Sequence, residues 1–309
     1  MTENHKEQKN VQVLIVGSGA AGLSAAIYTA RAGLQTVVLT GPTLGGQISL
    51  TAEVENYPGF PEVLSGVELV AKFQEQAEKF EAELDYDSAL KVDLSVRPFV
   101  VETEGKIYLA ENLILATGSK AIPLNVPGEE EFTGKGVSYC ATCDGFFFRG
   151  KKVAVVGGGN SAVEEALFLT RFASQVTIIH RRDTLRADAI VQKRAMENPK
   201  IDFLWDSVVE EVIGDGGVEK VRVRNVKTDQ VSEVPFDGVF VFIGHRPVSG
   251  LFDGQVEMEN GLAIVDSYMR TNVPGVYAAG ETVDGFYRQV AVSAAHGVMA
   301  AITLTKDNE

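Results

Sequence analysis

Cysteine is almost absent from this sequence, with two residues among 309. So few cysteines exclude the framework of several disulfides that stabilises small secreted domains. Basic residues are also scarce: the chain has 28 lysines and arginines against 42 aspartates and glutamates, a net charge of −14. A negative net charge of this size disfavours binding to a nucleic-acid backbone. The apolar stretches are strand-length and interrupted, and residues 1–10 are polar, so we expect neither a membrane span nor a secretory signal. The sequence therefore predicts a cytoplasmic protein that binds no nucleic acid and no membrane.

What is present suits a globular protein with two domains. Hydrophobic residues make up 45% and charged residues 23% of the chain, the balance of a protein that can bury full-size cores. At roughly 150 residues per domain the length favours two domains. Glycine is three times as frequent as proline, at 31 against 10, which fits many tight turns between strands and helices.

The two cysteines, Cys140 and Cys143, are spaced C-x-x-C, and this spacing has three interpretations. A zinc site needs further ligands, and the histidines show no paired metal spacing, so we predict no metal. They are His5, His180, His245 and His296. Two inert core thiols are the second interpretation. A redox-active dithiol is favoured, because a thiolate in such a motif can have a lowered pKa and exchange with other disulfides.

A first nucleotide-binding turn follows the apolar residues 11–16. It reads Gly17-Ser-Gly-Ala-Ala-Gly22 and leads into a helix rich in small residues. Gly17 permits a tight turn, Gly19 lets backbone amides approach a pyrophosphate, and Gly22 lets the helix lie close to the strand. The next strand, residues 35–39, ends in Thr40-Gly41 rather than in the acidic residue that binds an adenosine ribose. This difference weakens an NAD interpretation and leaves another dinucleotide, such as FAD, open.

A second unit of the same kind begins with the apolar residues 153–156. The turn Gly157-Gly-Gly-Asn-Ser-Ala162 precedes a helix, and the next strand ends in His180-Arg-Arg182, with Arg186 shortly after. A guanidinium group can bind phosphate oxygens with two parallel hydrogen bonds, so these arginines favour the 2′-phosphate of NADP(H). A solvated basic patch remains the alternative.

Three strand-like runs, residues 113–118, 239–244 and 276–280, end in glycine where the chain is expected to pass between domains. We predict an α/β fold of two Rossmann-like, three-layer ββα-type domains, the second inserted in the first. The predicted boundaries are 11–117 and 246–309 for the first domain and 118–245 for the second. Two nucleotide units and a dithiol together describe transfer of electrons from NADPH through a flavin to a disulfide.

Two apolar stretches lie outside these units. Leu69, Phe73, Ala77 and Phe80 are at helical spacing and predict an amphipathic helix over residues 66–84 with a core-facing side. Three phenylalanines, residues 146–148, precede the basic residues Arg149, Lys151 and Lys152. They form either a docking surface for a protein substrate or the start of a strand that packs inside.

Taken together, the motifs closely resemble the low-molecular-weight, bacterial-type NADPH-dependent thioredoxin reductases, over about residues 11–303. Besides the two glycine turns and the arginines, the resemblance includes Gly45-Gly-Gln47, Glu55-Asn-Tyr-Pro-Gly-Phe60, Ala116-Thr-Gly118, Cys140-Ala-Thr-Cys-Asp-Gly145 and Tyr287-Arg-Gln289.

The resemblance implies two cofactors and the residues that bind them. An FAD domain, split around an inserted NADPH domain, would bind FAD through Gly17, Gly19, Ala20, Gly22, Gln47, Asn56, Thr117, Gly118, Gly280, Glu281, Arg288, Gln289 and Val290. NADPH would be bound by Gly157, Gly159, Asn160, Ser161, Ala162, His180, Arg181, Arg182 and Arg186.

The resemblance also implies the catalytic roles. Cys143 would face the flavin and accept electrons, Cys140 would attack the disulfide of thioredoxin, and Asp144 would return a proton during exchange. For Asp144 a helix-start carboxylate that accepts backbone amides is the alternative. Members of the family are homodimers in which the NADPH domain rotates relative to the FAD domain, and the two short crossings, near residues 119–123 and 245–247, are suitable hinges.

One position departs from the family pattern. The sequence has Gly280-Glu281 where the family has Gly-Asp, whose carboxylate binds the ribityl chain of FAD. Glutamate keeps the charge and adds one methylene, so we expect FAD to be retained with a rearranged hydrogen bond.

Three other functions fit the sequence less well. A flavin thioredoxin reductase fed by ferredoxin tends to lack the second glycine motif and its arginines, and both are intact here. An enzyme that serves a peroxiredoxin-like partner would need a further domain. A non-catalytic flavin or nucleotide sensor would not need both cysteines and Asp144.

Overall fold

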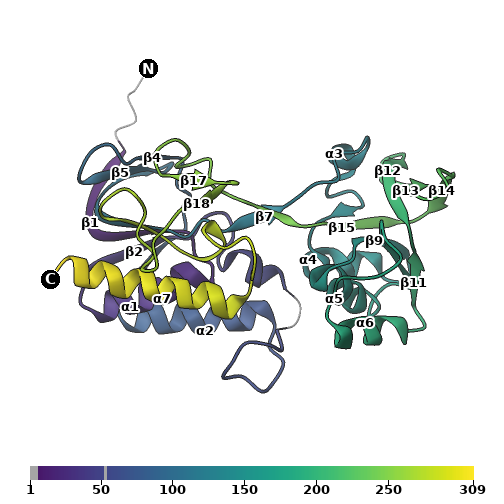
Figure 1. Cartoon of the computed structure of the whole chain (residues 1–309), viewed down its shortest axis with the longest axis horizontal. Helices are drawn as coiled ribbons and strands as arrows, with labels where there is room; N and C mark the ends of the chain where they lie inside the picture. The colour runs from purple at the N-terminus through teal and green to yellow at the C-terminus, as the bar shows by residue number, and fades with distance from the viewer. Residues whose placement is uncertain (1–5, 52–53) are drawn as a thin grey trace. The chain divides into compact units, whose positions relative to one another are not determined.

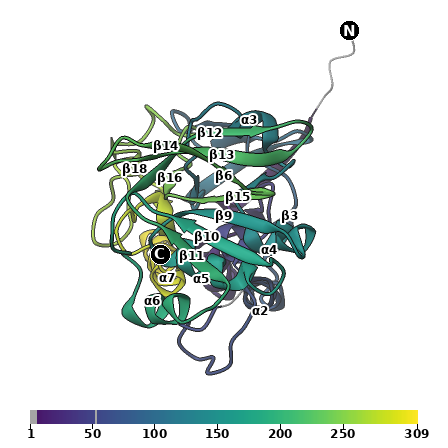
Figure 2. The same ribbon diagram turned by 90° about the vertical axis from the view of Figure 1, so that its right-hand side faces the viewer.

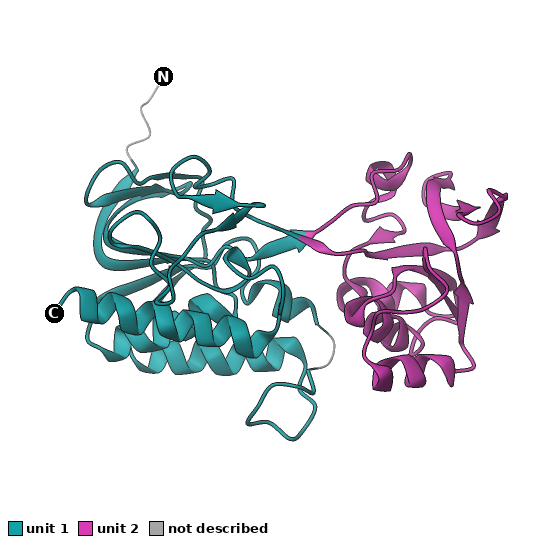
Figure 3. Cartoon of the chain, viewed as in Figure 1, with its two compact units in different colours: residues 1–120, 246–309 teal, residues 121–245 magenta. Residues whose placement is uncertain are grey.

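The structure, a computed structural model, describes residues 6–51 and 54–309 and divides into two compact units (Figure 3). His5 lies outside the described residues. Unit 1 is formed by the chain up to Lys120 and again from Arg246, and unit 2 by residues 121–245. The chain passes between them along β7 (Ser119–Ala121) and β16 (His245–Pro247), which pair as a two-stranded sheet. Unit 2 is therefore an insertion in unit 1.

Unit 1 is built on a seven-stranded sheet with a parallel centre (Figure 1). The order is β3-β2-β1-β6-β5-β4, with β19 also paired to β6. The β4–β5 and β5–β6 pairs are antiparallel, and the other neighbours are parallel. The strands are β1 (Glu7–Val16), β2 (Thr36–Leu39), β3 (Glu83–Asp85), β4 (Lys91–Asp93), β5 (Phe99–Glu102), β6 (Lys106–Leu115) and β19 (Val276–Ala278). The central strands are apolar on both faces because both faces are covered.

Three helices, α1 (Ala20–Arg31), α2 (Gly66–Lys79) and α7 (Val290–Asp307), cover one face of this sheet (Figure 1). Helices α1 and α7 approach closely, since a Cβ atom at Gly297 would lie 2.0 Å from the carbonyl oxygen of Ala21. The helix expected over residues 66–84 begins with a capping box between Ser65 and Glu68 but ends at Lys79. It is shorter than predicted because Glu81 has a φ of 67° and β3 starts at Glu83.

Unit 2 has a five-stranded parallel sheet in the order β11-β10-β9-β15-β8 (Figure 2). Its strands are β8 (Val137–Ser138), β9 (Lys152–Gly157), β10 (Gln175–Ile179), β11 (Ile201–Leu204) and β15 (Gly238–Phe242). The helices α4 (Ala141–Asp144), α5 (Asn160–Leu169) and α6 (Ala189–Met196) lie on one side. An antiparallel meander of β12 (Ser207–Gly214), β13 (Val218–Asn225) and β14 (Val231–Pro235) packs on the other.

These layers confirm the predicted fold class, α/β with two Rossmann-like units. The remaining short elements are η1 (Gly46–Leu50), α3 (Glu129–Phe132), η2 (Gly145–Phe148), β17 (Met258–Glu259), β18 (Leu262–Ala263) and η3 (Gly280–Thr282). Within the described residues, every helix is too short or too polar to cross a membrane.

Candidate active site

The first glycine turn joins β1 to α1 and leaves one position open. A Cβ atom at Gly17 would lie 2.2 Å from the carbonyl oxygen of Ala116, and one at Gly22 would lie 1.8 Å from that of Gly17. At Gly19 the nearest atom would be 3.9 Å away. Gly19 is the N-cap of α1 and no side chain caps it, so the first amide groups of the helix, from Ala20 on, are directed at this space. Such a cradle fits the pyrophosphate of a dinucleotide.

Ser18, which the sequence analysis did not single out, joins the loops around this turn. Its hydroxyl donates to the carbonyl oxygen of Thr40, at 2.8 Å, and accepts from the amide of Gly45, at 3.1 Å. The side chain is buried, with 2% exposed. In the sequence, only its position between two glycines of the turn pointed to a role for Ser18, because its hydrogen-bond partners are distant in sequence.

A polar cluster lies where β6 ends. The amide of Gly118 donates to Thr282, at 3.1 Å, and the amide group of Gln47 donates to the carbonyl oxygen of Ser119, at 3.2 Å. The hydroxyl of Ser119 donates to Glu281. The structure thus brings together Gln47, Gly118 and Glu281, which were predicted as FAD contacts.

Glu281 has a second partner in the loop that precedes α7. Its Oε1 atom is 3.7 Å from Nε of Arg288. In that loop Gln289 is the N-cap of α7, and its side chain accepts from Asn56 at 3.4 Å, while Val290 begins the helix. Asn56, Glu281, Arg288 and Gln289 therefore belong to one region of unit 1, as the sequence predicts for a single cofactor.

The second glycine turn, in unit 2, repeats this pattern. A Cβ atom at Gly157 would lie 2.4 Å from the carbonyl oxygen of Phe242, and one at Gly158 would lie 2.4 Å from the ring of His180. At Gly159 no atom would lie within 4 Å. Gly159 is the uncapped N-cap of α5, so a second dinucleotide cradle opens at the same topological point. Asn160 is tied to the loop before α6 by bonds to Asp188 of 2.9 and 2.6 Å.

The residues after β10 separate into one buried and three exposed side chains. Arg181, Arg182 and Arg186 are exposed, and in the described part of the chain none of them pairs with a carboxylate. The amide of Arg186 donates to the carbonyl oxygen of Gly158, at 2.6 Å, which joins the arginine loop to the glycine turn. His180 is 5% exposed and lies under Gly158; burial and the arginine charges lower its pKa. It stays neutral and supports the turn, and its direct contact with NADPH stays a prediction.

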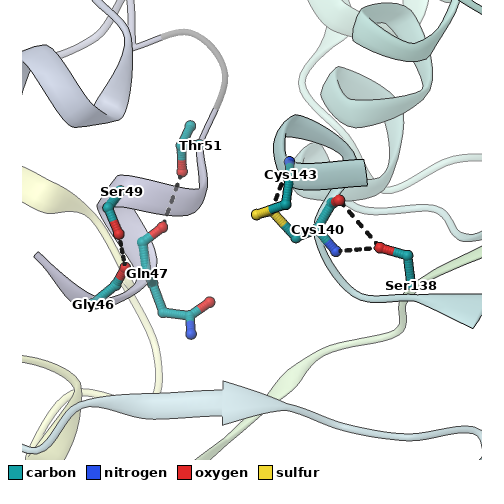
Figure 4. The surroundings of a disulfide bond; sticks show 7 residues. All are labelled: Gly46, Gln47, Ser49, Thr51, Ser138, Cys140 and Cys143. Carbon is teal, nitrogen blue, oxygen red and sulfur yellow. Dashed lines mark hydrogen bonds between the residues drawn. A yellow bond between two sulfur atoms is a disulfide. The ribbon is translucent and has the colours of Figure 1, made fainter. Parts of the chain in front are cut away.

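Cys140 and Cys143 form a disulfide at the start of α4, with Cα atoms 5.4 Å apart (Figure 4). Ser138 holds the segment by accepting from the amide of Cys140, at 3.0 Å, and donating to its carbonyl oxygen, at 3.1 Å. The amide of Cys143 donates to Sγ of Cys140, at 3.1 Å. Cys140 is half-buried and Cys143 is exposed.

Asp144 is the last residue of the four-residue helix α4 and also the N-cap of η2. Its side chain makes no capping hydrogen bond to η2, so the capping bond that the helix-start alternative requires is not found there. The side chain lines a groove of about 330 Å³ that also includes Lys135, Phe147, Lys151 and Asp237. The structure thus places a carboxyl group in the lining of this groove, next to Cys143 in the sequence.

The three phenylalanines next to the dithiol do not begin a strand; they lie in η2. Phe148 is buried and packs on Phe240, with ring centroids 5.1 Å apart. Phe146 and Phe147 are 60% and 70% exposed. The expectation of a strand is therefore wrong, and two of the rings are available at the surface beside the dithiol.

Among the described residues, no group of three or more histidine, cysteine or acidic side chains could hold a metal ion.

Comparisons with known proteins identify the family. The family model for pyridine nucleotide-disulphide oxidoreductases matches residues 11–297. A thioredoxin reductase of Rickettsia felis is 50% identical over 301 residues, which cover 96% of this chain and 97% of the relative. The chain belongs to the thioredoxin reductase family. The crystal structure of Lactococcus lactis thioredoxin reductase is 43% identical, with a TM-score of 0.92 over 96% of this chain and 98% of that one.

As a member of the thioredoxin reductase family, the chain is an oxidoreductase that uses FAD and NADPH. The ferredoxin-dependent alternative has less support. A ferredoxin-flavin thioredoxin reductase of Clostridium acetobutylicum is 29% identical, with a TM-score of 0.54 over 98% of this chain and 99% of that one. Both values are below those of the Lactococcus enzyme.

Proposed function

We propose that this protein is an NADPH-dependent flavoprotein disulfide reductase whose substrate is the disulfide of a thioredoxin. The observation that carries the proposal is the Cys140–Cys143 disulfide, with Cys143 exposed and Asp144 adjacent. The same unit has a dinucleotide turn and three exposed arginines, Arg181, Arg182 and Arg186, that pair with no carboxylate of the described residues. When bound, FAD accepts the two electrons of a hydride from NADPH and makes them available to a disulfide.

FAD is assigned to unit 1. The open space at Gly19 and the amides from Ala20 on would bind the pyrophosphate, with Gly17 and Gly22 shaping the turn. The rest of the cofactor would contact Gln47, Asn56, Thr117, Gly118, Gly280, Glu281, Arg288, Gln289 and Val290. The carboxylate of Glu281 is directed to Ser119 and Arg288, which supports the expected rearrangement at this position.

NADPH is assigned to unit 2. Gly157, Gly159, Asn160, Ser161 and Ala162 would form its pyrophosphate cradle at the start of α5. Arg181, Arg182 and Arg186 would bind the 2′-phosphate, since their guanidinium groups have no competing carboxylate in the described chain.

Exchange with the substrate is assigned to the two cysteines. Two-electron reduction of the disulfide gives two thiols, and the Cys140 thiolate attacks one sulfur of the thioredoxin disulfide, forming a mixed disulfide and releasing the first substrate thiolate. The Cys143 thiolate then attacks Sγ of Cys140, which restores the Cys140–Cys143 disulfide and releases the second substrate thiolate. The amide of Cys143 stabilises a thiolate on Cys140, and Asp144 supplies a proton to the leaving thiolate.

The groove beside Asp144 is assigned to thioredoxin. Phe147, at 70% exposed, provides an apolar contact at its edge, while Lys135 and Lys151 provide positive charge. Two other proposals concern the whole protein. The first is a homodimer, for which the side chains of Phe286 and Tyr287, 85% and 64% exposed, provide apolar contact area. The second is a cytoplasmic location, where NADPH is supplied.

The deciding experiment is anaerobic mixing of the FAD-loaded protein with NADPH and, separately, with NADH. Fast bleaching of the flavin absorbance by NADPH and much slower bleaching by NADH is the expected result. Absence of bleaching with both nucleotides would contradict NADPH as the donor and make ferredoxin the leading candidate.

A further inference from the structure

The loop between η3 and α7 carries Arg288 and Gln289 but has no regular secondary structure of its own. Its amide groups cannot be satisfied by a helix or a sheet, so another group must hold it in one conformation. That group is the carboxylate of Asp284, a residue to which neither the motifs nor the proposed cofactor contacts assign a role.

Asp284 accepts three backbone hydrogen bonds from the loop. Its Oδ1 atom accepts from the amides of Phe286 and Tyr287, both at 2.9 Å, and its Oδ2 atom accepts from the amide of Arg288, at 2.8 Å. The amide of Asp284 itself donates to the carbonyl oxygen of Gly280, at 2.9 Å. Asp284 therefore connects η3, through its backbone amide, with three consecutive residues of the loop, through its side chain.

The carboxyl group is buried, with 8% of the residue exposed. Burial alone would raise the pKa of Asp284, but the three amide bonds outweigh burial and lower it, with a further contribution from His296 on α7. Hydrogen bonds to a charged acceptor are stronger than those between neutral groups. The loop is thus held by charge-assisted bonds in a protected environment.

The bond to Arg288 has a particular consequence. Arg288 has a φ of 52°, in the left-handed region that is unfavourable for a residue with a Cβ atom. The amide that donates to Oδ2 of Asp284 is the amide of this same residue. With the backbone turned in this way, the guanidinium group of Arg288 reaches Glu281 and Gln289 takes the N-cap position of α7.

We infer that Asp284 is a positioning residue of the flavin site, which fixes the left-handed backbone of Arg288 and through it the side chains of Arg288 and Gln289. Asp284 acts through these neighbours and binds no cofactor itself. The inference rests on the proposed binding of FAD to unit 1.

The test compares the holoenzymes of the wild type, D284N and the control D253N. Asparagine has the shape of aspartate but loses the charge and offers only one acceptor oxygen to the three amides. We expect D284N to release FAD at least tenfold faster after dilution, measured by the fluorescence of free flavin, and trypsin to cleave after Arg288 at least tenfold faster. D253N, which changes an exposed aspartate of the same unit, should behave as the wild type. Unchanged flavin release and cleavage in D284N would overturn the inference.

Two further measurements separate positioning from a general loss of stability. Because glycine adopts a left-handed φ at no cost, the D284N substitution should accelerate flavin release severalfold more in an R288A background than in an R288G background. Equal effects in both backgrounds would contradict the role at Arg288. If D284N does not fold, hydrogen exchange of the wild type tests the inference instead. The amides of residues 286–288 should then be protected from exchange, and rapid exchange would refute their anchoring by Asp284. Failure of the wild type itself to bind FAD would instead refute the proposed function.

Discussion

The three arginines after β10 differ from other arginines of unit 2 in their surroundings. Arg222 and Arg224 each pair with two carboxylates, whereas Arg181, Arg182 and Arg186 pair with none in the chain as described. An arginine without an acidic partner keeps its fork of donors available for an incoming anion, and a 2′-phosphate is such an anion.

We expect R182A to raise the KM for NADPH about 10- to 100-fold and to leave the KM for NADH unchanged, because only NADPH carries the phosphate. Steady-state kinetics with both nucleotides measures this. The control is K193A, which removes an exposed cation from α6 in the same unit. Equal losses with NADPH and NADH would show that Arg182 supports the fold of the turn and not the phosphate.

Glu165 on α5 is a second informative residue, because it lies in the same helix as the NADPH turn but has no role in the proposed reaction. Its Oε2 atom is enclosed and has no partner among the described residues. Burial, with a smaller effect of Glu164, raises its pKa to about 8. The folded protein therefore keeps this proton between about pH 4.5 and pH 8 while the unfolded chain loses it, so stability falls as pH rises through that window.

We expect the E165Q variant not to lose stability between pH 4.5 and pH 8, because glutamine does not titrate. Its free energy of unfolding should exceed that of the wild type by about 1–3 kcal/mol at pH 8 and differ little from it at pH 4.5. Urea unfolding at both pH values tests the expectation. E197Q, an exposed glutamate that pairs with Lys193, serves as the control. A stability difference between E165Q and the wild type that does not change with pH would contradict the raised pKa.

At the scale of single elements, the short η2 helix decides which phenylalanine faces the solvent. Its 3₁₀ turn directs Phe148 onto Phe240 in the core and leaves Phe147 at the groove that Asp144 lines. A ring that is exposed beside a reactive disulfide costs little stability when it is removed, so its effect on activity can be measured directly.

We expect F147A to raise the KM for thioredoxin about tenfold while the rate of flavin reduction by NADPH stays the same. Rapid mixing with NADPH and steady-state assays with thioredoxin separate the two steps. The control L90A removes an exposed apolar side chain from unit 1. An unchanged KM would remove the docking role of this ring.

The elements also show how far the sequence alone carries the interpretation. The two strand-turn-helix units could be predicted because glycine spacing and apolar runs are local patterns, and the turns at Gly17 and Gly157 have the close backbone approaches that glycine permits. Ser18, Asp284 and the exposure of Phe147 could not, because each depends on what tertiary packing places nearby. Helix α2 ended early for a similar reason, since the backbone at Glu81 turns into β3.

At the scale of the whole molecule, the proposed reaction requires both units, since NADPH and the dithiol belong to unit 2 and FAD to unit 1. The family resemblance implies that unit 2 rotates relative to unit 1, and the paired crossings β7 and β16 are the segments about which it would turn.

We expect a covalent crosslink between the units, made with photoreactive residues and not with new cysteines, to reduce turnover at least tenfold. A crosslink of the same chemistry within unit 1 is the control. Full turnover in the crosslinked protein would rule out rotation as a required step.

The same crossings have a consequence for how such a protein can be assembled and altered. The amide of Ile122 donates to the carbonyl oxygen of Gly244, at 2.9 Å, so unit 2 begins and ends at one place. An inserted domain whose ends lie close together can be removed or replaced without distorting the domain that carries it. The 125-residue segment 121–245 is therefore one continuous stretch of gene that carries the proposed NADPH site and the dithiol together, so we expect a transplant of this segment to change the nucleotide donor and the disulfide partner at once while unit 1 is left as it is.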